Sequence, residues 1–95
     1  MRKNHNEQNL CEKEPLSAAQ IQAFHRTIAG NVARIRKAKG LSQLDLSLAI
    51  GYKSCSLVAG AEAGYKNVHF NLEQLYRIAS ALEVEISEFF KENDK

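Results

Sequence analysis

The chain has 95 residues, which suits a single domain, and its 44% hydrophobic and 25% charged residues are typical of a globular protein. Its apolar runs extend over only a few residues, which excludes a membrane span, and no apolar segment follows the N-terminus as in a secretory signal. These features predict a cytoplasmic protein that does not enter membranes.

The net charge of +2 is unevenly distributed along the chain. Basic residues predominate between residues 26 and 66, whereas acidic residues predominate after residue 67. A basic middle followed by an acidic tail fits a surface that faces a polyanion, and it fits a solvated charged face equally well. The charge pattern alone does not decide between the two.

Cysteine and histidine are sparse. Cys11 and Cys55 are too few for a disulfide framework, and together with the three histidines they show no ligand pairing at zinc spacing. We interpret both cysteines as reduced thiols and expect neither a metal nor a cofactor. No set of histidine, cysteine and carboxylate residues indicates a catalytic pocket, so the sequence does not predict an enzyme.

The first predicted elements are an arm and a helix. Residues 1–16 are polar and lack a hydrophobic period, which predicts a flexible arm. Ser17 and Gln20 then form a capping-box pattern, and apolar residues recur at helical spacing behind it. We therefore expect an additional N-terminal helical segment over residues 17–27.

The helical pattern continues beyond this segment towards Gly40. Arg36, Lys37 and Lys39 precede that glycine, and basic side chains interact favourably with the carboxyl end of a helix. Gly30 lies in the middle of the pattern, but a glycine costs a helix interior only about 1 kcal/mol. The sequence therefore leaves open whether one helix or two cover this region.

Two short helices are expected next. Ser42 is the predicted N-cap of the first, and Gly51 is its predicted end. Either Ser54 or Ser56 is the predicted N-cap of the second, which stops at Gly64.

The last part of the chain predicts one longer helix and a final turn. Asn71 is the expected cap of the helix, whose apolar face follows from the spacing of Leu75, Ile78 and Leu82. Ser87 is the expected cap of the final turn. No alternating β-branched run or hairpin signal occurs, so the predicted fold is all-α, a compact bundle of about five short helices.

The succession of helix, glycine, turn and helix resembles a known family. The run GLSQLDLSLAIG, followed by SLVAGAEAG and NLEQLYRIASALEVEISEFF, is similar to the helix-turn-helix domain of phage repressors, Cro proteins and bacterial Xre-type regulators. The resemblance implies a lambda repressor-like domain at residues 28–90, with the helix-turn-helix motif at about residues 43–63 and a tail at residues 91–95.

This resemblance implies a small transcriptional regulator, specifically a repressor, that binds double-stranded DNA as a homodimer with its third helix in the major groove. Gln43 and the backbone N–H groups beside it are expected to be free for a phosphate. The residues that the resemblance places at the DNA are Ser42, Gln43, Lys53, Ser54, Cys55, Ser56, Ala59, Gly60 and Lys66.

The helix expected in the groove departs from the family. At its base-facing positions, residues 54–56, 59 and 60, relatives often have Gln, Arg, Lys or Asn, whereas this chain has Ser, Cys, Ala and Gly. Such small side chains offer no bidentate contact to guanine or adenine. We therefore expect recognition of the DNA backbone and DNA shape with little base information, while Lys53 and Lys66 hold phosphates.

Arg36 and Glu62 match positions that form an ion pair in the family. The resemblance therefore implies a structural pair that ties the third helix to the first. A carboxylate at the DNA surface would instead repel phosphates, so we interpret Glu62 as a structural residue.

Leu44 and Leu48 fall where the family usually has exposed polar residues. Two outward leucines one helical turn apart need covering. Either the N-terminal segment with Ile21 and Phe24 lies over them, or the face receives a protein partner or a modified dimer contact. The alternative function is therefore an antitoxin-like or other protein-interaction module on the same fold, with weakened DNA reading.

Overall fold

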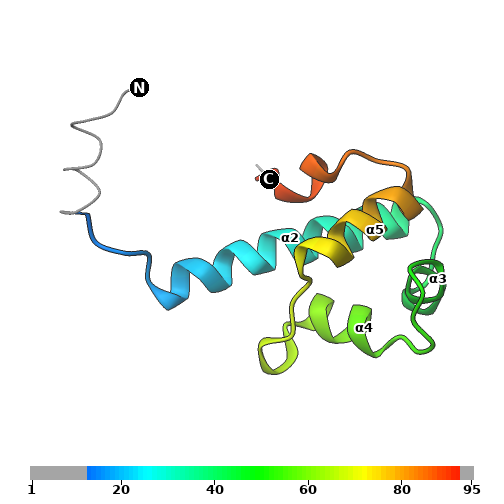
Figure 1. Cartoon of the computed structure of the whole chain (residues 1–95), viewed down its shortest axis with the longest axis horizontal. Coiled ribbons are helices and arrows are strands. Elements are labelled where there is room, and N and C mark those ends of the chain that lie inside the picture. Colours follow the sequence, from blue (N-terminus) through cyan, green and yellow to red (C-terminus); the bar gives the residue numbers. More distant parts are fainter. Residues whose placement is uncertain (1–12, 93–95) are drawn as a thin grey trace.

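The computed structural model describes residues 13–92 and contains, within that range, helices and no strand. The expected all-α fold is confirmed, while most of the expected arm and tail lies outside the described residues. The elements are α2 (Ala18–Ala38), α3 (Gln43–Ala49), α4 (Ser56–Ala63), η1 (Tyr65–Asn67), α5 (Leu72–Leu82) and η2 (Ile86–Phe90), where η denotes a 3-10 helix (Figure 1). Among residues 13–92, no helix combines the length and the apolar character that a membrane crossing requires.

α2 is one unbroken helix. The Gln20 N–H donates a hydrogen bond to the Ser17 hydroxyl at 3.1 Å, and the Ser17 N–H donates one to the Gln20 side chain at 2.8 Å. This capping box confirms the predicted helix start. The helical backbone then continues through Gly30 to Ala38, so a single helix covers the region for which the sequence leaves one or two.

One hydrophobic core joins the second half of α2 to the other helices. Val32 of α2, Leu46 of α3 and Val58 of α4 have no exposed surface. Burial of apolar surface contributes about 25 cal/mol per Å², so this core is the main source of stability. The residues of the apolar face that the sequence predicts for the helix after Asn71 are all buried, namely Leu75, Ile78 and Leu82, and Leu46, Ile50 and Val58 are buried with them.

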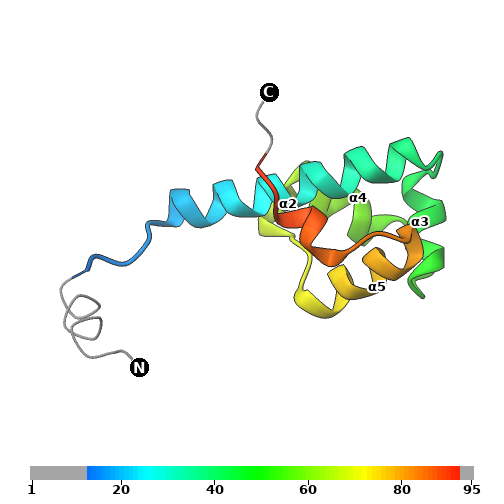
Figure 2. The same ribbon diagram turned by 90° about the horizontal axis from the view of Figure 1, so that it is seen from above.

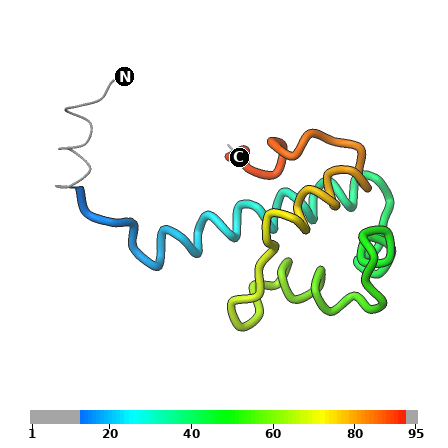
Figure 3. Tube along the Cα trace, in the orientation of Figure 1, coloured from blue at the N-terminus to red at the C-terminus, as the bar shows by residue number. Residues whose placement is uncertain are grey.

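The other elements surround the second half of α2. α4 and η2 contact α2 from different sides, while α3 lies at the carboxyl end of α2 and contacts both α4 and α5 (Figures 1 and 2). The Asn31 amide fastens η2 to α2, because it donates hydrogen bonds to the carbonyl oxygens of Phe89 at 2.9 Å and Lys91 at 2.8 Å. The first half of α2 extends away from this core (Figure 3).

α3 and α4 are each followed by the predicted glycine, but α4 starts with a different cap. Gly51 has a φ of +98° and Gly64 a φ of +69°, which are left-handed conformations that glycine adopts readily. The N-cap of α4 is Cys55, and its side chain makes no capping hydrogen bond, so the prediction of Ser54 or Ser56 is wrong. The Ser56 N–H donates instead to the Ser54 hydroxyl at 3.3 Å, which stabilises the turn before the helix.

The final turn also starts differently from the prediction. Ser87 lies inside η2, whose N-cap is Glu85 without a capping hydrogen bond from its side chain. Phe89 is completely buried, and Ile86 and Phe90 pack against the core. Packing of apolar side chains, rather than a serine cap, therefore holds this turn in place.

The N-terminal segment does not cover Leu44 and Leu48. These side chains are 45% and 54% exposed, and the first half of α2 lies at the opposite end of the molecule from α3 (Figure 1). Phe24 of this segment stacks on Phe90, with ring centroids 6.2 Å apart. Covering by the segment is therefore a wrong expectation, because the unbroken helix through Gly30 carries its first half away from α3.

Candidate nucleic-acid interface

α4 presents small polar side chains at its start. Ser54, Cys55 and Ser56 are all exposed, Cys55 as a free thiol, and no acidic residue lies in the first turn of the helix. The N–H groups at the start of a helix carry partial positive charge. This end of α4 can therefore approach a phosphate or a base edge closely.

The middle of α4 turns partly towards the protein. Ala59 is half-buried, and a Cβ atom added at Gly60 would meet Cγ1 of Val68 at 3.4 Å. One side of Gly60 therefore faces the segment that follows α4. The freely exposed side chains of the expected reading surface are those of residues 54–56.

The start of α3 is closed by a capping box. The Asp45 N–H donates to the Ser42 hydroxyl at 2.9 Å, and the Ser42 N–H donates to Oδ2 of Asp45 at 2.9 Å. Hydrogen bonds from the backbone and side chain of Ser42 hold the pKa of Asp45 below its ordinary value, so this carboxylate is charged at neutral pH. A phosphate that approaches Ser42 meets this negative charge.

Gln43 is engaged within the protein, contrary to the expectation that its side chain is free for a phosphate. Its Nε2 atom donates a hydrogen bond to Oε1 of Glu62 at 2.8 Å. This bond joins the first turn of α3 to α4. Gln43 therefore fixes the two helices of the motif relative to each other.

Arg36 and Glu62 form the ion pair that the family resemblance implies. Nε of Arg36 donates to Oε2 of Glu62, and Nη2 donates to Oε1, both at 2.8 Å. The two side chains are only 6% and 9% exposed, and Nη1 of Arg36 donates to the Leu41 carbonyl at 2.7 Å. The hydrogen bond to Glu62 raises the pKa of Arg36. The two hydrogen bonds hold α4 against α2. Because the pair is buried and neutral overall, it adds little positive charge to the surface.

Two exposed lysines flank α4 in the chain. Lys53 precedes the helix in the turn after α3, and Lys66 follows it in η1. The Lys66 ammonium lies 5.4 Å from the centroid of the Tyr65 ring, which is within the range of a cation–π contact. Both lysines are exposed to solvent, one before and one after α4 in the chain.

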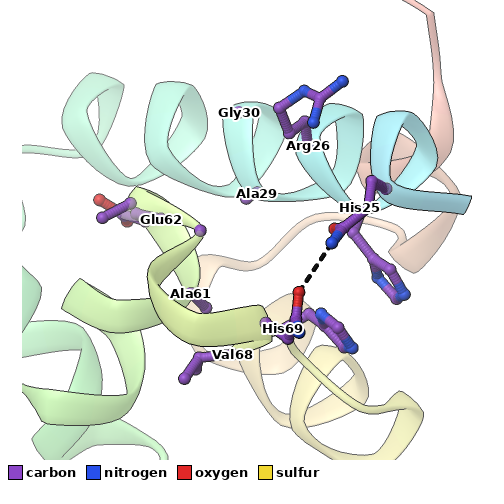
Figure 4. Close-up of a pocket in the computed structure, with 12 residues that line it drawn as sticks. His25, Arg26, Ala29, Gly30, Ala61, Glu62, Val68 and His69 are labelled. Atoms are coloured by element: carbon purple, nitrogen blue, oxygen red, sulfur yellow. Dashed lines mark hydrogen bonds between the residues drawn. The ribbon is translucent and has the colours of Figure 1, made fainter. Parts of the chain in front are cut away.

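An open cleft of about 430 Å³ lies between the first half of α2 and the end of α4 with η1 (Figure 4). The imidazole rings of His25 and His69 stack there, with centroids 3.7 Å apart and an angle of 8° between the planes. Beside them, the Gln22 amide donates to Oδ1 of Asn67 at 2.7 Å. Sequence reasoning missed this cluster because no local pattern connects residues that lie so far apart in the chain.

Among residues 13–92, no three or more histidine, cysteine or carboxylate side chains are placed to hold a metal ion. Glu62, which borders the cleft, is already bonded to Arg36 and Gln43. The surface at the start of α4 offers exposed hydroxyl groups, and exposed lysines lie before and after the helix in the chain.

These features together define a helix-turn-helix DNA-binding protein. α3 and α4 are joined by a short turn at Gly51 and fastened through Gln43 and Glu62, while the first turn of α4 stays open. This arrangement is the one that presents a recognition helix to a DNA groove.

Comparison with known proteins identifies the family. The family model HTH_3, described as helix-turn-helix, matches residues 32–89, and the chain belongs to this family. The restriction-modification controller protein C.AhdI from Aeromonas hydrophila has a similar structure, with a TM-score of 0.63 and 32% identity over 72% of this chain and 98% of that chain. An HTH_3 family transcriptional regulator from Vibrio cholerae is similar with a TM-score of 0.63 and 30% identity over 73% of this chain.

The chain spans 37% of the length of the Vibrio cholerae regulator. No curated protein gives a significant match. Family membership and the two similar structures establish a DNA-binding helix-turn-helix transcription regulator of the Xre type. The family match begins at residue 32, so the first half of α2 lies outside it.

Proposed function

We propose that the protein is a homodimeric transcriptional repressor whose α4 enters the major groove of double-stranded DNA. The observation that carries this proposal is the open first turn of α4, where Ser54, Cys55 and Ser56 are exposed and no acidic residue intervenes. Lys53 and Lys66, on either side of the helix in the chain, contact phosphates.

The side chains of α4 support recognition through the DNA backbone and DNA shape. A bidentate contact from Arg to guanine or from Gln to adenine contributes about 1–3 kcal/mol of discrimination, and residues 54–56 contain neither side chain. Gln43 and Arg36 are both engaged with Glu62. Small side chains allow the backbone of α4 to come close to the groove, where groove width and deformability decide the affinity.

The small size of the reading surface supports a dimer. α4 has only eight residues, and a single DNA-binding module buries about 600–1,000 Å² of protein surface. Two copies that bind half-sites about one helical turn of DNA apart double the phosphate contacts.

A titration of the full chain with preferred and scrambled DNA duplexes at two salt concentrations tests the proposal. Affinity should fall steeply with salt, by about 0.9 in log–log slope for each phosphate neutralised. Lys53→Ala or Lys66→Ala should weaken binding to every duplex and flatten this slope by roughly one unit.

Lys91→Ala is the matched control, because Lys91 is exposed, lies beyond η2 and pairs with Glu88 at 2.8 Å. It should leave the slope unchanged. Strong discrimination between duplexes at high salt would contradict recognition by shape, and a complete lack of binding at low salt would contradict DNA binding. Sedimentation of the protein alone and with a duplex measures the dimer.

The exposed leucine pair favours a second candidate function. Leu44 and Leu48 remain 45% and 54% exposed on α3. We infer an antitoxin-like or other protein-interaction module, in which this face receives a protein partner, as the alternative to repression. Co-purification from the native host, with both DNA and protein analysed, distinguishes the two: Leu48→Asp should release a bound protein while leaving bound DNA in place.

A further inference from the structure

The first half of α2 touches the loop after α4 at two points. The Gln22 amide donates a hydrogen bond to Oδ1 of Asn67 at 2.7 Å. One turn further along, the His25 ring stacks on the His69 ring with centroids 3.7 Å apart (Figure 4). Both contacts come from a part of α2 that precedes the family match at residues 32–89.

The loop itself has little internal support. Lys66 and Asn67 have φ values of +48° and +63°, a left-handed conformation that residues other than glycine rarely hold. Non-glycine residues persist there only when their surroundings fix them. One backbone hydrogen bond closes η1, from the Val68 N–H to the Tyr65 carbonyl at 2.8 Å, and Val68 packs against the core beside Gly60.

We propose that the first half of α2 is a brace that holds this loop, and with it Lys66, in the conformation that contacts a DNA phosphate. Gln22 and His25 are then positioning residues for DNA binding, which act through Asn67 and His69 without touching DNA. This inference rests on the proposed function, because it assigns Lys66 to a phosphate. The first half of α2 is thus a segment outside the family match that fixes the loop after the recognition helix.

The stacked histidines make the brace sensitive to pH. Protonation of both rings would place two positive charges in direct contact. The other charged groups on the cleft walls are Arg26 of α2 and Glu62 of α4, whose carboxylate already pairs with Arg36, and Lys66 lies on η1. None of them supplies a free negative charge to a second imidazolium.

The pKa of His25 is held below its ordinary value by burial and by the nearby charge of His69. The state in which the two histidine rings are stacked therefore binds fewer protons than a state in which the first half of α2 has separated from the loop. The contact between α2 and the loop therefore has its full stability above the ordinary histidine pKa of about 6.5. This stability is lost as the pH falls from that value towards the lowered pKa of His25. DNA affinity should then weaken on acidification, which is the opposite of the general effect of added positive charge.

Amide hydrogen exchange of the full chain tests the brace without DNA. Exchange at residues 65–69 should be faster in His25→Ala and Gln22→Ala than in the wild type at pH 7.5, while exchange in α5 stays the same. His25→Phe should keep slow exchange, because an aromatic ring preserves the stack. Unchanged exchange in both alanine variants would overturn the brace, whatever the outcome for DNA.

DNA affinity at pH 7.5 and pH 5.5 tests the consequence. The wild type should bind several-fold more weakly at pH 5.5, His25→Ala should bind several-fold more weakly at both pH values, and His25→Phe should lose the pH-dependent weakening. Lys91→Ala, which changes an exposed residue paired with Glu88, is the control and should keep the pH dependence of the wild type. Lys66→Ala should add little to His25→Ala, because both changes remove one contact.

A wild type that binds more tightly at pH 5.5, or a His25→Phe variant that keeps the weakening, would overturn the pH-sensitive brace. The failure of the proposed function is a separate result: in that case no variant binds DNA, whereas the exchange rates still show the brace.

Discussion

The two halves of α2 differ sharply in what surrounds them. In residues 28–38, Ile28, Val32 and Ile35 are buried in the core, and Arg36 is buried in its ion pair. In residues 18–27 no side chain is fully buried. This half reaches the rest of the molecule through a few side chains, at Gln22, Phe24 and His25.

The difference shows that one half of a helix can build the core while the other half makes contacts outside it. Capping at Ser17 and helical propensity make α2 continuous, but only its second half shares the core. The first half takes its orientation from the second and makes contacts that contribute little to the stability of the fold. We therefore expect substitutions in the second half to change the free energy of unfolding, and substitutions in the first half to change local order and binding.

The largest contrast should come from two arginines at different places in α2, Arg36 and Arg26. Arg36→Ala leaves Glu62 buried without its partner, and breaking one side of a buried pair typically costs about 3–5 kcal/mol. Arg26→Ala, at an exposed position in the first half, should stay within about 0.5 kcal/mol of the wild type. Urea unfolding followed by circular dichroism measures both, and equal losses would contradict the division of the helix.

Two isoleucines give the same contrast for apolar packing. Ile28 is 5% exposed and Ile21 is 43% exposed. Ile28→Ala should lower the free energy of unfolding by about 2–5 kcal/mol, because it leaves a cavity in the core. Ile21→Ala should change it by less than about 1 kcal/mol. The pair can be compared in the same unfolding experiment, and a large loss for Ile21→Ala would show that the first half belongs to the core.

The smallest effect is expected at the junction of the two halves. Gly30 is exposed, and an added Cβ atom would meet nothing within 4 Å. Gly30→Ala should therefore stabilise the helix by roughly 0.5–1 kcal/mol. Amide exchange should slow along residues 18–30. A destabilised variant would indicate that the junction must bend, which a continuous helix does not require.

Much of the fold could be predicted from the sequence because its signals are local. The caps at Ser17, Ser42 and Asn71 each depend on a partner three residues away, and all three form capping boxes. Glycines at the helix ends and apolar residues at helical spacing are equally short-range patterns. The start of α4 escaped prediction because its cap lies between two candidate serines and makes no side-chain bond.

The candidate site was less accessible from the sequence. The positions at the start of α4 follow from the motif, but the engagement of Gln43 with Glu62 joins residues 19 apart and has no local sign. The cluster at His25 and His69 is still more distant, and the direction of the first half of α2 depends on whether Gly30 interrupts the helix. Long-range pairs of this kind follow from packing, which periodicity alone does not specify.

Because α2 continues unbroken through Gly30, the second half of the helix also fixes the rotation of the first half about the helix axis. Each residue of an α-helix turns the chain by about 100°, so one residue inserted at Gly30 would rotate Gln22 and His25 away from η1 without changing their chemistry. A flexible linker would impose no such condition. A whole turn inserted there would restore the rotation but would move both residues by about 5.4 Å along the helix axis. The segment before the family domain can therefore be neither lengthened nor shortened at this junction without the loss of these contacts.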